Sequence, residues 1–195
     1  MNLLAHLYLS DGSEFVMVGN FIADFIKGNK FENLPEGVIM GIKLHRAIDE
    51  FTDSHPIVKD CTNLIKNKYG RYSGIVIDVF FDFFLAVYWT NYSSLDLKEF
   101  TQKAYKSLNK RYYLLPNPLK ELLPTIIHED WLYNYGSIDG LNRTFLGLTN
   151  RIDKKKDLSN ATNSLIANYD FFDKAFQRFF PELIEHVRNY RMMLL

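Results

Sequence analysis

Residues 75–89 have the sequence IVIDVFFDFFLAVYW, and this stretch decides the fold class. It is apolar around the whole circumference of a helix, which is typical of a helix buried in a protein core. Two aspartates interrupt it, Asp78 and Asp82, and their spacing of four residues places them on one helix face. A buried carboxylate without a partner is strongly unfavourable. The stretch therefore predicts a central helix whose carboxylates meet a cation, either an arginine or a metal ion.

Helical patterns extend from this stretch towards the N-terminus. We expect a short helix before Ser10, a second helix that ends near Gly28, and a third from Pro35 to about Ser54. Pro56 follows the third helix, and a fourth is expected over residues 57–68.

The same pattern continues towards the C-terminus. Ser93 or Ser94 is expected to cap a helix that runs to about Arg111. Further helices are expected over residues 119–128, 137–151, 159–169, 171–179 and 181–192. No stretch shows the period-two alternation of a strand. The chain is predicted to be all-α, a compact bundle of many helices.

Composition narrows the class of protein. The 195 residues, 47% of them hydrophobic, suit one domain over residues 1–195. The 23 basic and 23 acidic residues cancel, which argues against nucleic-acid binding. Cys61 is the single cysteine, so we expect no internal disulfide and a reduced, cytoplasmic setting. We expect neither a signal peptide nor a membrane span, because the apolar runs are short and carry charges.

Other ionisable residues also lie in apolar surroundings. His6 lies in LLAHLYL and Asp24 in GNFIADFI, where each was expected inside a core. His45, Asp49 and Asp53 follow one another at intervals of four residues, so they share one stripe of the third helix. Imidazoles and carboxylates on separate helices predict one convergent site that suits Mn, Fe, Zn or Mg. An ion in such a site activates water and stabilises charge on a phosphoryl oxygen.

Each of these residues also has a structural interpretation, which stays open at this point. His6 could be a hydrogen-bonded core histidine, and Asp24 could cap the backbone. Asp78 and Asp82 could pair with Arg46 or Arg71 as structural ion pairs. Other catalytic signatures are absent from the sequence: a glycine-rich phosphate loop, a Gly-x-Ser-x-Gly elbow, paired Glu-x-x-His motifs and a His-Glu-x-x-His helix.

Together, four motifs resemble the acyl carrier protein phosphodiesterase family. They are MNLLAHL at residues 1–7, GNFIADFIKG at 19–28, GIKLHRAIDEFTDSHP at 41–56 and DVFFDFFL at 78–85. The family is regarded as a divergent relative of the HD-domain phosphohydrolases. The resemblance implies an HD-like helical fold and a manganese-dependent enzyme of lipid metabolism. The implied reaction is hydrolysis of the phosphodiester between 4'-phosphopantetheine and a serine of holo-acyl carrier protein.

The resemblance also implies the site residues. The implied metal ligands are His6, Asp24, His45, Asp49, Asp78 and Asp82. Catalytic roles are expected for Asp24, for Arg46 as a bidentate phosphate contact, and for His55 or a site aspartate as the acid that protonates the leaving serine. Relatives often carry histidines where this chain has Tyr8 and Phe83, and the adjacent His-Asp dipeptide of ordinary HD domains is absent.

An acidic carrier protein as partner requires a basic docking face. The candidates are two sets of residues, either Arg143, Arg151, Lys154, Lys155 and Lys156, or Lys103, Lys106, Lys110 and Arg111. Two other functions remain alternatives. One is an HD-type nucleotide phosphohydrolase, which would keep the metal site. The other is a non-catalytic helical adaptor, in which the buried carboxylates would pair with arginines and no metal would bind.

Overall fold

A computed structural model describes residues 1–28, 31, 33–150 and 157–194. Within these residues every regular element is a helix, which confirms the all-α prediction. The longer ones are α1 (Leu3–Tyr8), α2 (Glu14–Ile22), α3 (Glu36–Ser54), α4 (Pro56–Tyr69), α5 (Ser73–Val87), α6 (Leu97–Lys110), α7 (Asn117–His128), α8 (Trp131–Asn134), α9 (Ile138–Thr149), α10 (Ala161–Ala167) and α11 (Tyr169–Leu194). Short 3-10 turns follow four of them, at Ala23–Phe25, Gly70–Tyr72, Trp89–Asn91 and Tyr112–Leu114.

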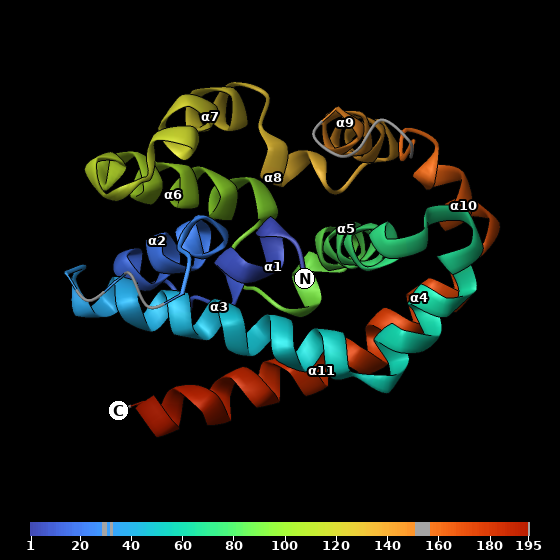
Figure 1. The fold of residues 1–195 in the computed structure, drawn as a ribbon, viewed down its shortest axis with the longest axis horizontal. Helices are drawn as coiled ribbons and strands as arrows, with labels where there is room; N and C mark the ends of the chain where they lie inside the picture. The colour runs from blue at the N-terminus through green and yellow to red at the C-terminus, as the bar shows by residue number, and fades with distance from the viewer. Residues whose placement is uncertain (29–30, 32, 151–156, 195) are drawn as a thin grey trace.

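Helices α1, α2 and α5 lie inside the bundle. Figure 1 shows α3 and α11 along one side of them, and α6, α7, α8 and α9 along the opposite side. Residues 79–85 of α5 are all buried, as the apolar sequence of this segment predicts. Among the described residues, no helix combines the length and apolar character needed to cross a bilayer.

Two glycines allow α2 and α3 to touch through their backbones. A Cβ atom on Gly19 would lie 2.0 Å from the carbonyl oxygen of Val38, and one on Gly41 would lie 2.1 Å from that of Val16. Only glycine leaves room for such an approach. The contact brings Asn20, which follows Gly19, close to His45, which lies one helical turn beyond Gly41.

Two predicted helix boundaries are wrong. The second helix ends at Ile22 rather than near Gly28, and a 3-10 turn follows it. Asp96, not Ser93 or Ser94, caps α6 by accepting a hydrogen bond from the amide of Glu99 at 2.8 Å. The predicted basic connection over residues 151–156 lies outside the described residues.

The last two predicted helices form one helix, α11, which continues through Pro181. A proline inside a helix costs about 3 kcal/mol because it removes a hydrogen bond and crowds the preceding turn. Phe179, Phe180 and Leu183 flank it and are fully buried. Burial of each such side chain stabilises by roughly 1.5–3 kcal/mol, so packing outweighs the local cost.

Candidate active site

The position of His6 depends on a carboxylate from α5. The backbone amides of Leu4 and Ala5 donate to the two oxygens of Asp82, at 2.7 and 3.2 Å. The first amides of a helix lack partners within it and carry partial positive charge, so they attract an anion. Backbone amides at the N-terminus of α1 are therefore the partners of Asp82, in place of the predicted arginine or metal ion. Burial nevertheless raises the pKa of Asp82 to about 7.

Two histidine rings form the centre of the site. The rings of His6 and His45 are stacked, with centroids 4.0 Å apart and an interplanar angle of 17°. Each ring has its Nδ1 atom beside Asn20 and its Nε2 atom beside Asp49. The Nε2–oxygen distances to Asp49 are 3.2 Å for His6 and 3.0 Å for His45. A second carboxylate, that of Asp24, lies 3.1 Å from Nε2 of His45.

The charges in this cluster are strongly coupled. Burial opposes protonation of His45, but its hydrogen bonds with Asp24 and Asp49 outweigh burial and raise its pKa to about 9. Burial and the nearby charge of His45 lower the pKa of His6 to about 4. Although burial opposes ionisation of Asp49, its contacts with the rings of His45 and His6 hold its pKa well below the usual range. The two carboxylates thus stay ionised beside a single protonated ring.

The donor set fits a divalent metal ion. One ligand atom each from His6, His45 and Asp49 lies within 4.8 Å of the others. Asp24 adds a carboxylate whose side chain is 77% exposed, so it can turn towards an ion on the open side of His45. Imidazole nitrogens with carboxylate oxygens suit Mn, Fe, Zn or Mg. The exposure of Asp24 contradicts the expectation of a core position, because α2 ends before it.

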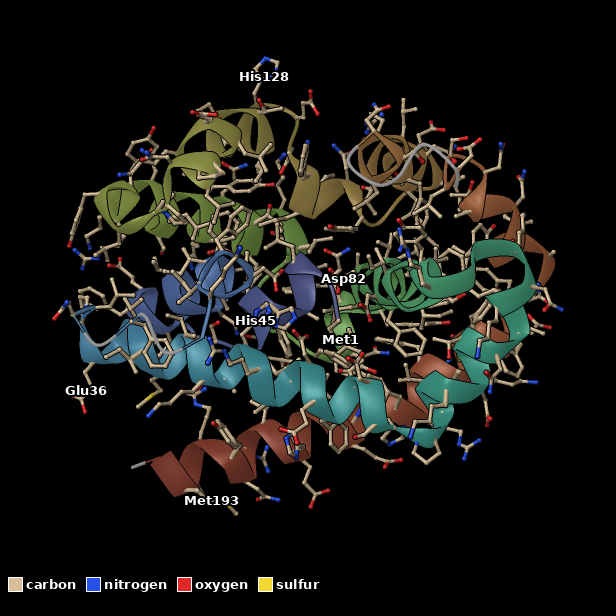
Figure 2. The ribbon with its side chains drawn as sticks, in the orientation of Figure 1. Met1, Glu36, His45, Asp82, His128 and Met193 are labelled. Carbon is tan, nitrogen blue, oxygen red and sulfur yellow. The ribbon has the colours of Figure 1, made fainter. Side chains whose placement is uncertain are left out.

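Asp78 lies next to this group rather than inside it. One of its oxygens is 3.1 Å from the amino nitrogen of Met1, which is also 3.9 Å from Asp49. Burial raises the pKa of Asp78. Figure 2 shows Met1, His45 and Asp82 near one another in the middle of the molecule. The structure thus gathers all six predicted metal ligands around the N-terminal turn of α1, with His6, His45 and Asp49 as the tightest subset.

A large cavity borders the cluster. The cavity has a volume of about 900 Å³, and its lining includes the cluster residues together with Arg71 and Arg143. Apolar side chains from α7, α8 and α9 form another part of the lining, with Leu119, Leu122, Ile126, Trp131, Leu146 and Leu148. An ionic end and apolar walls suit an elongated substrate with an anionic head and a less polar chain.

Two predicted catalytic residues lie away from the cavity lining. The guanidinium of Arg46 donates to the carbonyls of Gly28 and Ile26, at 2.6 and 3.3 Å, and lies over the ring of Phe31. Arg46 thus connects α3 to the segment that follows α2. Nε2 of His55 lies 3.2 Å from Glu182.

Tyr8 and Phe83, the positions at which relatives often have histidines, also point elsewhere. The hydroxyl of Tyr8 donates to the carbonyl of Tyr92 at 2.8 Å. Phe83 packs edge-on against Phe84 and Tyr169 in the core. Both side chains serve packing between α1, α5 and the C-terminal helix.

The sequence analysis missed Asn20. Its side chain is 1% exposed and contacts both histidines of the cluster. The signal was present, because a buried amide needs hydrogen-bond partners just as a buried carboxylate does. Buried charge does not reveal this residue, because an amide side chain is neutral.

Fold and site together define a class, a helical hydrolase in which histidines and aspartates converge beside a large cavity. Comparison with known proteins identifies the family. The model of the acyl carrier protein phosphodiesterase family matches residues 1–183, and the chain belongs to this family. The predicted resemblance is confirmed, and so is the predicted enzyme class, a phosphoric diester hydrolase.

Several relatives carry the name acyl carrier protein phosphodiesterase. One from Photorhabdus laumondii is 30% identical over 190 residues, which cover 97% of this chain and 96% of the relative. One from Escherichia coli O6:H1 is 33% identical over 186 residues, with 95% and 96% coverage. One from Serratia proteamaculans is 30% identical over 190 residues, with 97% and 98% coverage. No solved structure was found to match the chain.

Proposed function

We propose that this protein hydrolyses the phosphodiester between 4'-phosphopantetheine and a serine of holo-acyl carrier protein, and that it needs a divalent ion, Mn²⁺ being the first candidate. The names of the relatives support the substrate. The observation that carries the metal requirement is the convergence of His6, His45 and Asp49, whose ligand atoms lie within 4.8 Å of one another. The products would be apo-carrier protein and 4'-phosphopantetheine.

In this proposal the cluster holds the ion and the cavity holds the substrate. A bound divalent ion would supply Lewis-acid activation of water and neutralise charge on the phosphoryl oxygens. Asp24, the most exposed carboxylate of the group, is placed to accept the proton of the attacking water. Asp78, which lies beside the cluster, is our candidate for the acid that protonates the leaving serine oxygen.

The cations that line the cavity are better placed for the phosphate than Arg46. Arg71 and Arg143 lie in the cavity lining, whereas Arg46 is hydrogen-bonded to backbone carbonyls. Arginine suits this role because its planar fork matches two phosphate oxygens. We therefore propose Arg71 or Arg143 for the phosphate contact. In this proposal His55, which is paired with Glu182, has no direct part in the reaction.

The proposed docking face is the rim of the cavity around Arg143. In the alternative basic set on α6, acidic partners already offset much of the charge. Lys103 pairs with Glu99, and both Lys110 and Arg111 pair with Glu14. We also propose a cytoplasmic location, because the chain has a single, buried cysteine. We propose a common ancestry with HD-domain proteins because of the sequence motifs.

The test is to incubate metal-stripped protein with holo-acyl carrier protein, with and without Mn²⁺, and to follow the mass of the carrier. We expect loss of the phosphopantetheine mass only with Mn²⁺, and no loss with Asp49→Asn. Glu50→Gln is the matched control, because Glu50 is the exposed neighbour of Asp49 on α3. Tight Mn²⁺ binding without turnover would point to a nucleotide substrate instead. Absence of both binding and turnover would favour the adaptor alternative.

A further inference from the structure

The buried side chain of Asn20 connects the two histidines. Its amide nitrogen donates to the carbonyl of His6 at 2.7 Å and to the hydroxyl of Ser10 at 3.1 Å. Its amide oxygen lies 2.9 Å from Nδ1 of His6 and 3.1 Å from Nδ1 of His45. One side chain thus meets both rings on the edge that faces away from Asp49.

The orientation of this amide follows from the end of α1. His6 lies in the last turn of the helix, where carbonyl groups have no partner within the helix. Its carbonyl accepts hydrogen bonds from Ser10 at 2.9 Å and from Asn20 at 2.7 Å. Because a carbonyl can only accept, the NH₂ group of Asn20 must face it. The amide oxygen of Asn20 must then face the imidazole rings.

This orientation determines which ring nitrogen carries the proton. An oxygen beside Nδ1 requires an N–H there, in both histidines. His45 has a second acceptor at the same position, because its Nδ1 is 2.9 Å from the backbone carbonyl of Asn20. A neutral imidazole has one N–H only, so whenever a ring is neutral, an N–H at Nδ1 leaves a lone pair on Nε2.

The lone pairs on Nε2 face oxygen atoms. Nε2 of His6 lies 3.2 Å from the carbonyl of Met1 and 3.2 Å from Asp49. Nε2 of His45 lies 3.0 Å from Asp49 and 3.1 Å from Asp24. Lone pairs that face one another repel unless a cation lies among them. In the metal-free protein that cation is the extra proton on His45, and a metal ion bound by both Nε2 atoms would take its place.

We propose that Asn20 is the positioning residue of the site, which holds both histidines as Nδ1–H tautomers and directs two Nε2 lone pairs at one divalent cation. The proposal rests on the metal site of the proposed function, but the tautomer can be measured without metal or substrate. Groups that orient metal-bound histidines typically contribute about 10–100-fold to metal affinity.

The first measurement is long-range ¹H–¹⁵N correlation on the metal-free protein at neutral pH, with ¹⁵N-labelled histidine and His6→Gln for assignment. We expect the proton of neutral His6 on Nδ1. The second is the Mn²⁺ dissociation constant of three variants by calorimetry. Asn20→Ala should bind about 10–100-fold more weakly and lose the Nδ1–H preference. Asn20→Asp keeps an acceptor towards both rings and should recover most of the affinity.

Ser10→Ala is the matched control, because Ser10 is buried in the same network but touches neither ring. It should bind Mn²⁺ as the parent protein does. A proton on Nε2 of His6 in the parent protein would overturn the proposal, and so would undiminished Mn²⁺ binding by Asn20→Ala. If the parent protein shows the Nδ1–H tautomer but binds no Mn²⁺, the proposed function fails and the positioning role of Asn20 stands. The tautomer of the parent protein decides the matter even if Asn20→Ala does not fold.

Discussion

Replacement of Gly41 by alanine tests the link between helix packing and the site. The new Cβ would lie 2.1 Å from the carbonyl oxygen of Val16 and 2.8 Å from the amide nitrogen of Asn20. Both neighbours are backbone atoms of α2, so no side chain can move out of the way. To reach an ordinary contact distance, α2 and α3 must separate by about 1 Å in a densely packed interior.

The expected effect is large on both stability and metal binding. Overpacking of a core costs about 1–3 kcal/mol, and contact with rigid backbone places Gly41→Ala near the upper end. The same separation would lengthen the hydrogen bond between Nδ1 of His45 and the backbone carbonyl of Asn20, which is 2.9 Å long in the parent protein. A displacement of about 1 Å breaks a hydrogen bond of this length. Mn²⁺ affinity should then fall about tenfold or more.

The assays are urea unfolding followed by circular dichroism and Mn²⁺ titration by calorimetry. Gly147→Ala in α9 is the control, because a Cβ there meets nothing within 4 Å. Alanine in an open helical position should stabilise by about 0.5–1 kcal/mol. A free energy of unfolding of Gly41→Ala within about 0.5 kcal/mol of the parent value, together with equal Mn²⁺ affinity, would refute the link between helix packing and the site.

Three further predictions concern charge. In the metal-free protein the pKa of His45 is raised from 6.5 to about 9, so its contribution to stability is complete below pH 6.5 and is lost as the pH rises through 9. The free energy of unfolding should fall as the pH rises across this range, and His45→Gln should reduce this fall. Equal slopes for the parent protein and His45→Gln would contradict the prediction. The pKa of Asp82 is raised from 3.8 to about 7, so stability should also fall with rising pH between these values, and Asp82→Asn should abolish this part of the slope in urea unfolding. An unchanged slope would remove Asp82 as its source. Arg143→Glu should raise KM for holo-carrier protein severalfold at low salt, whereas Lys103→Glu, on the neutralised α6 face, should not; equal effects would move the docking face away from Arg143.

Much of the fold could be predicted because it depends on local pattern. The all-round apolar sequence of residues 75–89 identifies a buried helix without knowledge of its neighbours, and residues 79–86 of α5 are buried. The boundaries that failed depend on distant contacts. The helix continues through Pro181 because Phe179, Phe180 and Leu183 are buried against other helices, which sequence spacing alone does not reveal.

The site was predictable where it follows helical spacing. His45 and Asp49 are four residues apart on α3, and both reach the same cluster. Asp82 was recognised as a buried carboxylate, but its partners are amides 77 and 78 residues away, and backbone groups leave no mark in a sequence. The role of Asn20 depends on which way a neutral amide turns, and that is fixed only once α1 and α2 are in place.

The attachment of α1 to Asp82 also sets an order of events during synthesis of the chain on the ribosome. Helices α2 and α3 emerge early and can bring Asn20 beside His45 through their glycine contact. Helix α1 emerges before them, but the carboxylate that holds its first turn belongs to α5. A nascent chain that stops short of α5 therefore has no anchor for His6. The cluster of His6, His45 and Asp49 is therefore complete only when roughly the first half of the protein has been made.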